Sequence, residues 1–111
     1  MRVFFFEPND RFNTAPAEKH GEIYYIFDER KLSLDVNQLA ESAIGSLQRQ
    51  NFNPATDHIA CSGNIAMLCV VSAAVMDSYG ELPLLIFEAK SGEYIPRTLE
   101  AFLDPDDADL D

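Results

Sequence analysis

The stretch DHIACSGNIAMLCVVSAAVMDSYGELPLLIF, residues 57–87, decides the fold class. It starts with a strand-like segment at 58–61, passes through Ser62-Gly63-Asn64 into a long apolar segment at 65–79, and ends in a second strand-like segment at 82–87. A helix of this length between two buried strands requires parallel pairing and a right-handed crossover. The stretch therefore predicts one βαβ unit.

Strands and helices are also predicted on both sides of this unit, from apolar runs and from turn and capping residues. They are a strand at 3–6 closed by Glu7-Pro8, a short helix capped by Thr14 that ends at Gly21, a strand at 23–27, a helix opened by Asp35 with Gln38 in a capping box, and a turn at 89–92 into an edge strand at 93–95 with Pro96 near its end.

This order of elements predicts an α/β fold, a small three-layer Rossmann-like sandwich with a mostly parallel sheet of four to five strands and an antiparallel edge strand. The order of the strands in the sheet stays open. We expect residues 1–103 to form a single domain. Residues 104–111 hold five aspartates and no cation, which predicts a solvated, acidic, disordered tail.

Charge restricts the partners. The chain of 111 residues has a formal net charge of −11, from 19 acidic and 8 basic residues. Nucleic-acid binding requires a basic surface that displaces counterions from phosphates, and an anionic membrane leaflet repels an acidic protein. We expect neither partner. The apolar run at 3–6 is too short for a signal peptide, and no run of about 18 apolar residues occurs, so we expect a cytoplasmic protein.

The segment 65–79 has almost no polar face before Asp77. A helix that is apolar all round requires burial all round, which a small domain supplies only in part. One interpretation is a homodimer whose interface includes Met67, Val70, Val71 and Ala74. The alternative is burial within one chain.

Ser62-Gly63-Asn64 lies where a parallel strand ends and a helix begins. Open α/β sheets bind ligands at this edge, and free backbone N–H groups there attract anions. One interpretation is a phosphate or nucleotide site at Ser62, Gly63 and Asn64, with Asn9 and Asp10 as neighbours. Ordinary helix capping is the other, because the run has neither a dinucleotide-binding glycine repeat nor a phosphate loop.

Two catalytic patterns are considered, and a non-catalytic interpretation is preferred for each. Asp57, Glu88 and Lys90 partly match the Asp…Glu-x-Lys set of magnesium nucleases, but a full helix separates the two carboxylates. Cys61 ends a strand as a nucleophile would, yet strand alternation turns His58 away from it. Cys61 and Cys69 have no zinc spacing and are expected to be buried, reduced thiols. We predict no catalytic residue, no metal and no cofactor.

Several turn and strand segments together carry a resemblance. They are Val3-Phe4-Phe5-Phe6-Glu7-Pro8, His20-Gly21-Glu22-Ile23, residues 52–59, Ser62-Gly63, Tyr79-Gly80 and residues 84–87. Over about residues 3–97 this pattern resembles that of small uncharacterised accessory proteins of bacteriophages and mobile elements. The resemblance implies a phage-type accessory protein that acts in the host cytoplasm on a host or defence component.

Three classes of function remain. The first is a non-enzymatic, acidic, protein-binding or regulatory module, expected to be a homodimer with a host protein as a further partner. The second is a small-ligand protein that binds phosphate or a nucleotide at Ser62–Asn64. The third is a metal-dependent nuclease-like enzyme.

Overall fold

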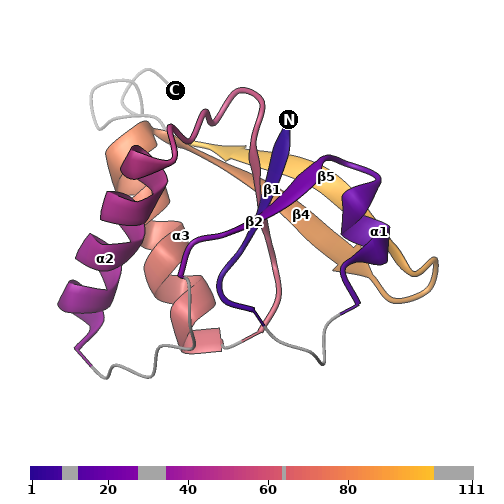
Figure 1. Ribbon diagram of the computed structural model, residues 1–111, viewed down its shortest axis with the longest axis horizontal. Helices are drawn as coiled ribbons and strands as arrows, with labels where there is room; N and C mark the ends of the chain where they lie inside the picture. Colours follow the sequence, from indigo (N-terminus) through magenta and orange to yellow (C-terminus); the bar gives the residue numbers. More distant parts are fainter. Residues whose placement is uncertain (9–12, 28–34, 64, 102–111) are drawn as a thin grey trace, which may run out of the picture.

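The computed structural model describes residues 1–8, 13–27, 35–63 and 65–101. In these ranges the chain forms one five-stranded sheet and three helices (Figure 1). In chain order the elements are β1 (Arg2–Phe5), α1 (Ala15–Glu18), β2 (Glu22–Tyr25), α2 (Val36–Arg49), β3 (His58–Ala60), α3 (Ile65–Tyr79), β4 (Glu81–Glu88) and β5 (Glu93–Glu100). The predicted acidic tail at 104–111 lies outside the described residues.

The strand order in the sheet is β2-β1-β3-β4-β5. β1 pairs in parallel with β2 and with β3, and β3 pairs in parallel with β4. β5 runs antiparallel to β4 and forms the edge opposite β2. The α/β class and the mixed sheet with an antiparallel edge strand are therefore confirmed, and the strand order, which the sequence left open, is settled.

The two faces of the sheet are covered unequally. Both long helices, α2 and α3, lie against one face, whereas the four-residue α1 packs on the other (Figure 1). Each face has its own apolar core: Phe4, Ile59 and Leu82 point toward the long helices, while Phe5 and Leu85 point toward α1. The Rossmann-like three-layer description stays a prediction, because so short a helix hardly forms a layer.

Helix α2 follows its sequence pattern. The Asp35 side chain accepts a hydrogen bond from the Gln38 N–H, so the predicted N-cap is confirmed. Leu39, Ala43 and Leu47 are buried on the sheet side. Thr14 is the N-cap residue of α1 as predicted, but its side chain makes no capping bond, and the helix ends at Glu18 rather than at Gly21.

Helix α3 buries one side in the chain's own core. Met67, Val71 and Val75 have at most 3% of their surface exposed. Val70 and Ala74 are half-buried. Met67 and Val71 therefore offer no free surface to a second copy, and an interface on α3 would have to use its exposed residues instead. The largest of these is Ile65, and Cys69, expected to be buried, is exposed as well.

Strand β5 is longer than its sequence suggests, because Pro96 lies inside it rather than near its end. Pro96 lies opposite Leu85, whose carbonyl oxygen accepts the Cys61 N–H at 2.9 Å across the β3–β4 pair. Because the Leu85 carbonyl oxygen faces β3 rather than β5, Leu85 and Pro96 form a pair that exchanges no hydrogen bonds. The Pro96 nitrogen therefore lies on the free edge. The missing N–H consequently breaks no bond of the sheet.

Candidate functional site

A pocket of about 490 Å³ opens on the α1 side of the sheet, beyond the carboxyl end of β3. In Figure 1, α1 and the β4–β5 turn, which both contribute to its lining, lie to the right. Its lining comes from four parts of the chain: Asn13, Pro16, Cys61, Ser62, Phe87, Gly92 and Tyr94. Ligands of open α/β sheets bind at this edge, because the strands end there and the loops that follow them surround a crevice.

Part of the predicted ligand turn contributes to this pocket. Ser62 lines it, and the Ser62 Oγ is buried without a hydrogen-bond partner among the described residues. Gly63 is exposed, with φ +75°, and is not part of the lining. Asn9, Asp10 and Asn64, the other predicted members, lie outside the described residues.

The remaining polar groups of the pocket are neutral. Burial raises the pKa of the Cys61 thiol, so the thiol stays protonated at neutral pH. Burial, and secondarily the neighbouring Cys61, raise the pKa of the Tyr94 phenol. A protonated, half-buried thiol is a poor nucleophile.

The aromatic side chains missed by sequence reasoning form one wall of this pocket. The Phe87 and Tyr94 rings meet edge-to-face with their centroids 5.3 Å apart, and Tyr94 also contacts Phe5 edge-to-face. Phe87 is nevertheless 47% exposed. The strand register could have indicated this wall, because Phe87 lies directly opposite Tyr94.

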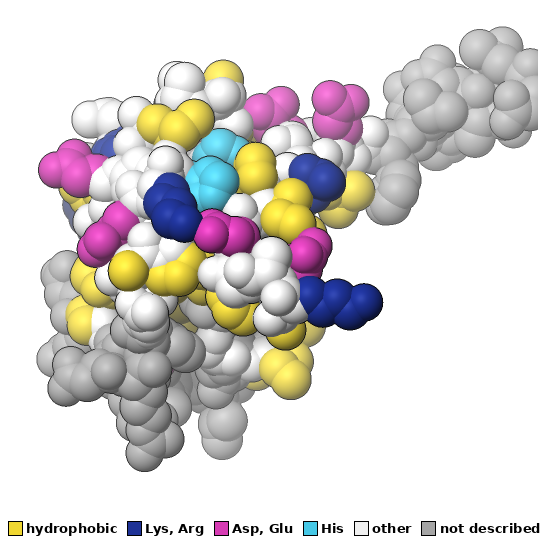
Figure 2. All heavy atoms as spheres, turned by 90° about the vertical axis from the view of Figure 1, so that its right-hand side faces the viewer, with side chains coloured by type: hydrophobic (Ala, Val, Ile, Leu, Met, Phe, Trp, Pro, Cys, Tyr) yellow, Lys and Arg dark blue, Asp and Glu magenta, His cyan; other side chains and the backbone are white. Residues whose placement is uncertain are grey.

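Both histidines lie on the α1 side of the sheet, and Figure 2, which looks at that end of the molecule, shows them side by side between charged and apolar side chains. His58 Nδ1 is buried without a hydrogen-bond partner in the described part of the chain. Burial, and then the positive charge of His20, lower the pKa of His58, while Asp57 opposes this shift. Neither histidine lines the pocket.

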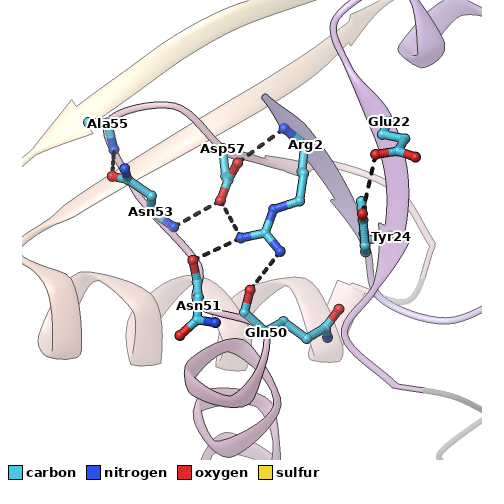
Figure 3. A network of polar contacts seen from close by, with 8 residues as sticks. All are labelled: Arg2, Glu22, Tyr24, Gln50, Asn51, Asn53, Ala55 and Asp57. Carbon is cyan, nitrogen blue, oxygen red and sulfur yellow. Dashed lines mark hydrogen bonds and ion pairs between the residues drawn. The ribbon is translucent and has the colours of Figure 1, made fainter.

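At the opposite edge of the sheet, where the strands begin, Arg2 and Asp57 form an ion pair of 2.9 Å (Figure 3). The Arg2 guanidinium also donates to the carbonyl oxygens of Gln50 and Asn51, which end α2. Asp57 accepts the backbone N–H groups of Arg2 and Asn53. This network joins β1, α2 and β3. Both oxygens of the Asp57 carboxylate accept hydrogen bonds within it, so neither is free for catalysis.

The pairing of β3 with β4 argues against the nuclease pattern. Ile59 pairs with Leu84, which puts Asp57 level with Leu82 at the start of β4, whereas Glu88 ends that strand. Six residues of strand separate the two carboxylates by about 20 Å, too far to share a metal ion. Among the residues that the structure describes, no three His, Cys, Asp or Glu side chains gather in a way that could hold a metal.

A second candidate surface lies on the β4–β5 hairpin, on the face of the long helices. Cross-strand partners share a face, so Ile86 and Ile95 lie with Leu82 and Leu99. Leu82 is buried beneath the helices, but Ile86 and Leu99 are 42% and 44% exposed. We call Ile86, Ile95 and Leu99 the hairpin patch. Arg97 lies between them on β5 and is exposed.

Between α2 and α3 runs a shallow groove of about 400 Å³. It includes Ala74, one of the interface residues predicted from the sequence, together with Ala40, Glu41, Ile44, Gly45, Gln48, Asp77 and Ser78. The acidic side chains of Glu41 and Asp77 make this groove more polar than the hairpin patch. No helix in the described ranges is long and apolar enough to cross a lipid bilayer.

Comparison with known proteins identifies the family. Residues 6–101 match the model of the phage Pam3 gp32-like protein family. The match covers most of the chain, so the chain belongs to this family, and the resemblance to phage accessory proteins is confirmed. No curated protein and no solved structure matches the chain.

Proposed function

We propose that this phage protein is a non-enzymatic, acidic, protein-binding module that contacts its partner through the hairpin patch. The observation that carries this proposal is the pair of exposed aliphatic side chains, Ile86 and Leu99, on the same face of an edge hairpin. Apolar side chains that gather on one surface commonly mark an interaction site, whereas scattered ones need no explanation.

The fold explains why this surface is left open. The face of β1 and β3 is covered by α2 and α3, and their inward side chains are fully buried. β5 is two strands away from β3. Its main contacts are with β4 and α1 rather than with either long helix. The apolar side chains of the outer hairpin therefore remain available for a partner.

Charge favours a basic partner over a second copy of the chain. The chain carries −11, and two copies brought together repel one another at long range. Next to the patch on the hairpin, Glu88 lies opposite Glu93, which also pairs with Lys19, and like charges directly opposite one another destabilise a sheet. A partner with apolar side chains flanked by Arg or Lys would cover the patch and relieve this repulsion.

The partner that we propose is a basic protein of the host, met in the host cytoplasm. A homodimer stays a proposal of lower rank, since the two most buried of its predicted contacts, Met67 and Val71, have no exposed surface. Its remaining surface would be the outer side of α3, around Ile65 and Cys69. This surface differs from the hairpin patch, so mutations separate the two proposals.

The test is affinity capture from host lysate with the wild-type protein and with the double variant Ile86→Ser, Leu99→Ser. We expect a basic protein that the wild type captures and the double variant does not. After purification this protein should bind the wild type alone in a one-to-one complex. Val36→Ser is the matched control, because Val36 is 51% exposed on α2 and belongs to no patch.

Two results would overturn the proposal. One is a partner that binds the wild type and the double variant equally, which would move the interface away from the hairpin. The other is a dimer in native mass spectrometry that the double variant abolishes, because a second copy would then occupy the patch.

A further inference from the structure

We infer that the pocket beside Ser62 binds a small, uncharged aromatic molecule that carries a hydrogen-bond acceptor, with its ring against Phe87 and Tyr94 and its acceptor at the Ser62 hydroxyl. This site lies on the α1 face of the sheet, whereas the hairpin patch lies on the helix face. The inference is thus independent of the proposed protein-binding function and can fail separately from it.

Size and shape suit such a ligand. The pocket of about 490 Å³ is within the range of cavities that hold small molecules. Such cavities are mostly apolar with a few convergent polar groups. Here Pro16, Phe87 and Tyr94 supply the apolar walls, while Asn13, Cys61 and Ser62 supply the polar groups.

The Ser62 hydroxyl indicates an acceptor on the ligand. Its oxygen is buried and has no partner among the described residues. Buried polar groups in proteins nearly always have a hydrogen-bond partner, so one without any points to a partner that is absent from the free protein. The Ser62 oxygen has almost no accessible surface in the free protein, so the hydroxyl would have to rotate into the pocket to donate its proton to a carbonyl or ring nitrogen of a bound molecule.

Charge argues against an anion in this pocket. Among the residues that the structure describes, the lining contains no Lys, Arg or His. The nearby cation Lys19 is engaged by Glu93, with Nζ 2.7 Å from the carboxylate. Gly63 and Ile65, on either side of the α3 start, are not part of the lining. A phosphate would lose its hydration here without gaining a counter-charge from any described residue of the lining.

The aromatic wall favours a ring over an aliphatic group. Phe87 and Tyr94 already meet edge-to-face, and Phe87 keeps nearly half of its surface exposed. A third ring placed against this pair extends the same favourable arrangement and removes exposed apolar surface from water.

Benzamide and benzoate form a matched pair for the test, because they have nearly the same shape and differ in charge. The experiment is a titration of the ¹⁵N-labelled protein followed by ¹H–¹⁵N NMR. With benzamide we expect saturating shifts at Cys61, Ser62 and Gly92 and a Kd of about 1–10 mM, as befits so small a molecule. Benzoate should bind at least about tenfold more weakly, since it would bury a charge without a partner.

Three variants sharpen the test. Ser62→Ala should weaken benzamide binding about tenfold and at the same time raise the melting temperature, because it removes a buried hydroxyl that has no partner. Phe87→Ala should weaken binding by removing half of the aromatic wall. The double variant Ile86→Ser, Leu99→Ser should bind benzamide like the wild type, which keeps this site distinct from the hairpin patch.

The inference is overturned if benzoate binds as tightly as benzamide, or if the shifts centre on Gly63 and Ile65, since the helix start would then be an anion site. It is also overturned if benzamide gives no saturable shift up to about 50 mM, several times the expected Kd. Unchanged benzamide affinity in Ser62→Ala would remove the hydroxyl from the site.

Discussion

Asp57 shows how much one residue can hold together. Its carboxylate pairs with Arg2 and accepts two backbone N–H groups, so its removal leaves a partly buried guanidinium without its counter-charge. We expect Asp57→Ala to lower the free energy of unfolding by about 3 kcal/mol, within the range for breaking such pairs. Urea denaturation measures this loss.

Glu22→Ala is the control for that experiment. Glu22 is exposed, and within the described residues its side chain accepts a hydrogen bond from the Tyr24 hydroxyl, so its loss should change the stability by less than about 0.5 kcal/mol. If Asp57→Ala cost no more than Glu22→Ala, the network in Figure 3 would not be holding β1, α2 and β3 together.

His58 should make stability depend on pH. Burial and the charge of His20 lower its pKa in the folded protein. The unfolded chain, with an ordinary value of about 6.5, therefore binds the proton more readily. Stability should be complete above about pH 6.5 and fall as the pH drops toward the folded pKa.

The measurement is the melting temperature between about pH 7.5 and pH 5, where histidine dominates titration. His58→Gln should flatten the profile, whereas His20→Gln should only reduce its slope, because burial of His58 remains. A His58→Gln profile as steep as that of the wild type would place the effect elsewhere.

At the level of single elements, one side of α3 is buried in the core and the other side is exposed. Val71 is fully buried, whereas Cys69 is exposed two residues away. Val71→Ala should lower the stability by about 1.5–3 kcal/mol, and Cys69→Ser by less than about 0.5 kcal/mol. Equal effects in thermal denaturation would mean that the helix is rotated relative to this structure.

Strand β5 is an open edge protected by Pro96. The Pro96 nitrogen lies on the free side, where an N–H group would invite another strand. We expect Pro96→Thr to associate at concentrations where the wild type does not, as measured by light scattering after gel filtration. Thr98→Val is the control: it keeps a similar shape at the same edge and adds no N–H. Association of both variants alike would assign the effect to side chains.

Some elements could be predicted from the sequence and others could not, for physical reasons. The N-cap Asp35 and the bounds of the segment 65–79 follow from local signals, which the structure confirms. The length of β5 does not follow from local signals. A proline fits a strand where its nitrogen faces away from the paired strand, and the local sequence does not show on which side that strand lies. Likewise, an all-apolar helix does not reveal which of its sides meets the sheet, so the sequence left open whether Met67 and Val71 meet a second copy or the core of their own chain.

The candidate sites were only partly visible in the sequence for a similar reason. Ser62 stood out because it follows a strand and precedes a helix. Its neighbours Pro16, Phe87 and Tyr94 come from distant parts of the chain, and only the strand order brings them beside it. The hairpin patch likewise depends on how far α3 extends over β4, which no local pattern encodes.

At the scale of the whole molecule, the net charge of −11 should accelerate association with a basic partner. Electrostatic steering acts mainly on the association rate and is screened by salt. We expect the association rate to fall about tenfold or more between about 20 and 500 mM salt, with a smaller change in the dissociation rate. A salt-independent rate in stopped-flow mixing would argue for a neutral partner.

We propose that the hairpin patch is the surface that binds a protein partner. Its most direct test is an isothermal titration of the purified partner into the wild type, into Ile86→Ser, Leu99→Ser, and into Val36→Ser. We predict that the double variant loses at least about tenfold in affinity, or about 1.4 kcal/mol, and that Val36→Ser matches the wild type. Equal affinity of all three proteins would contradict the claim.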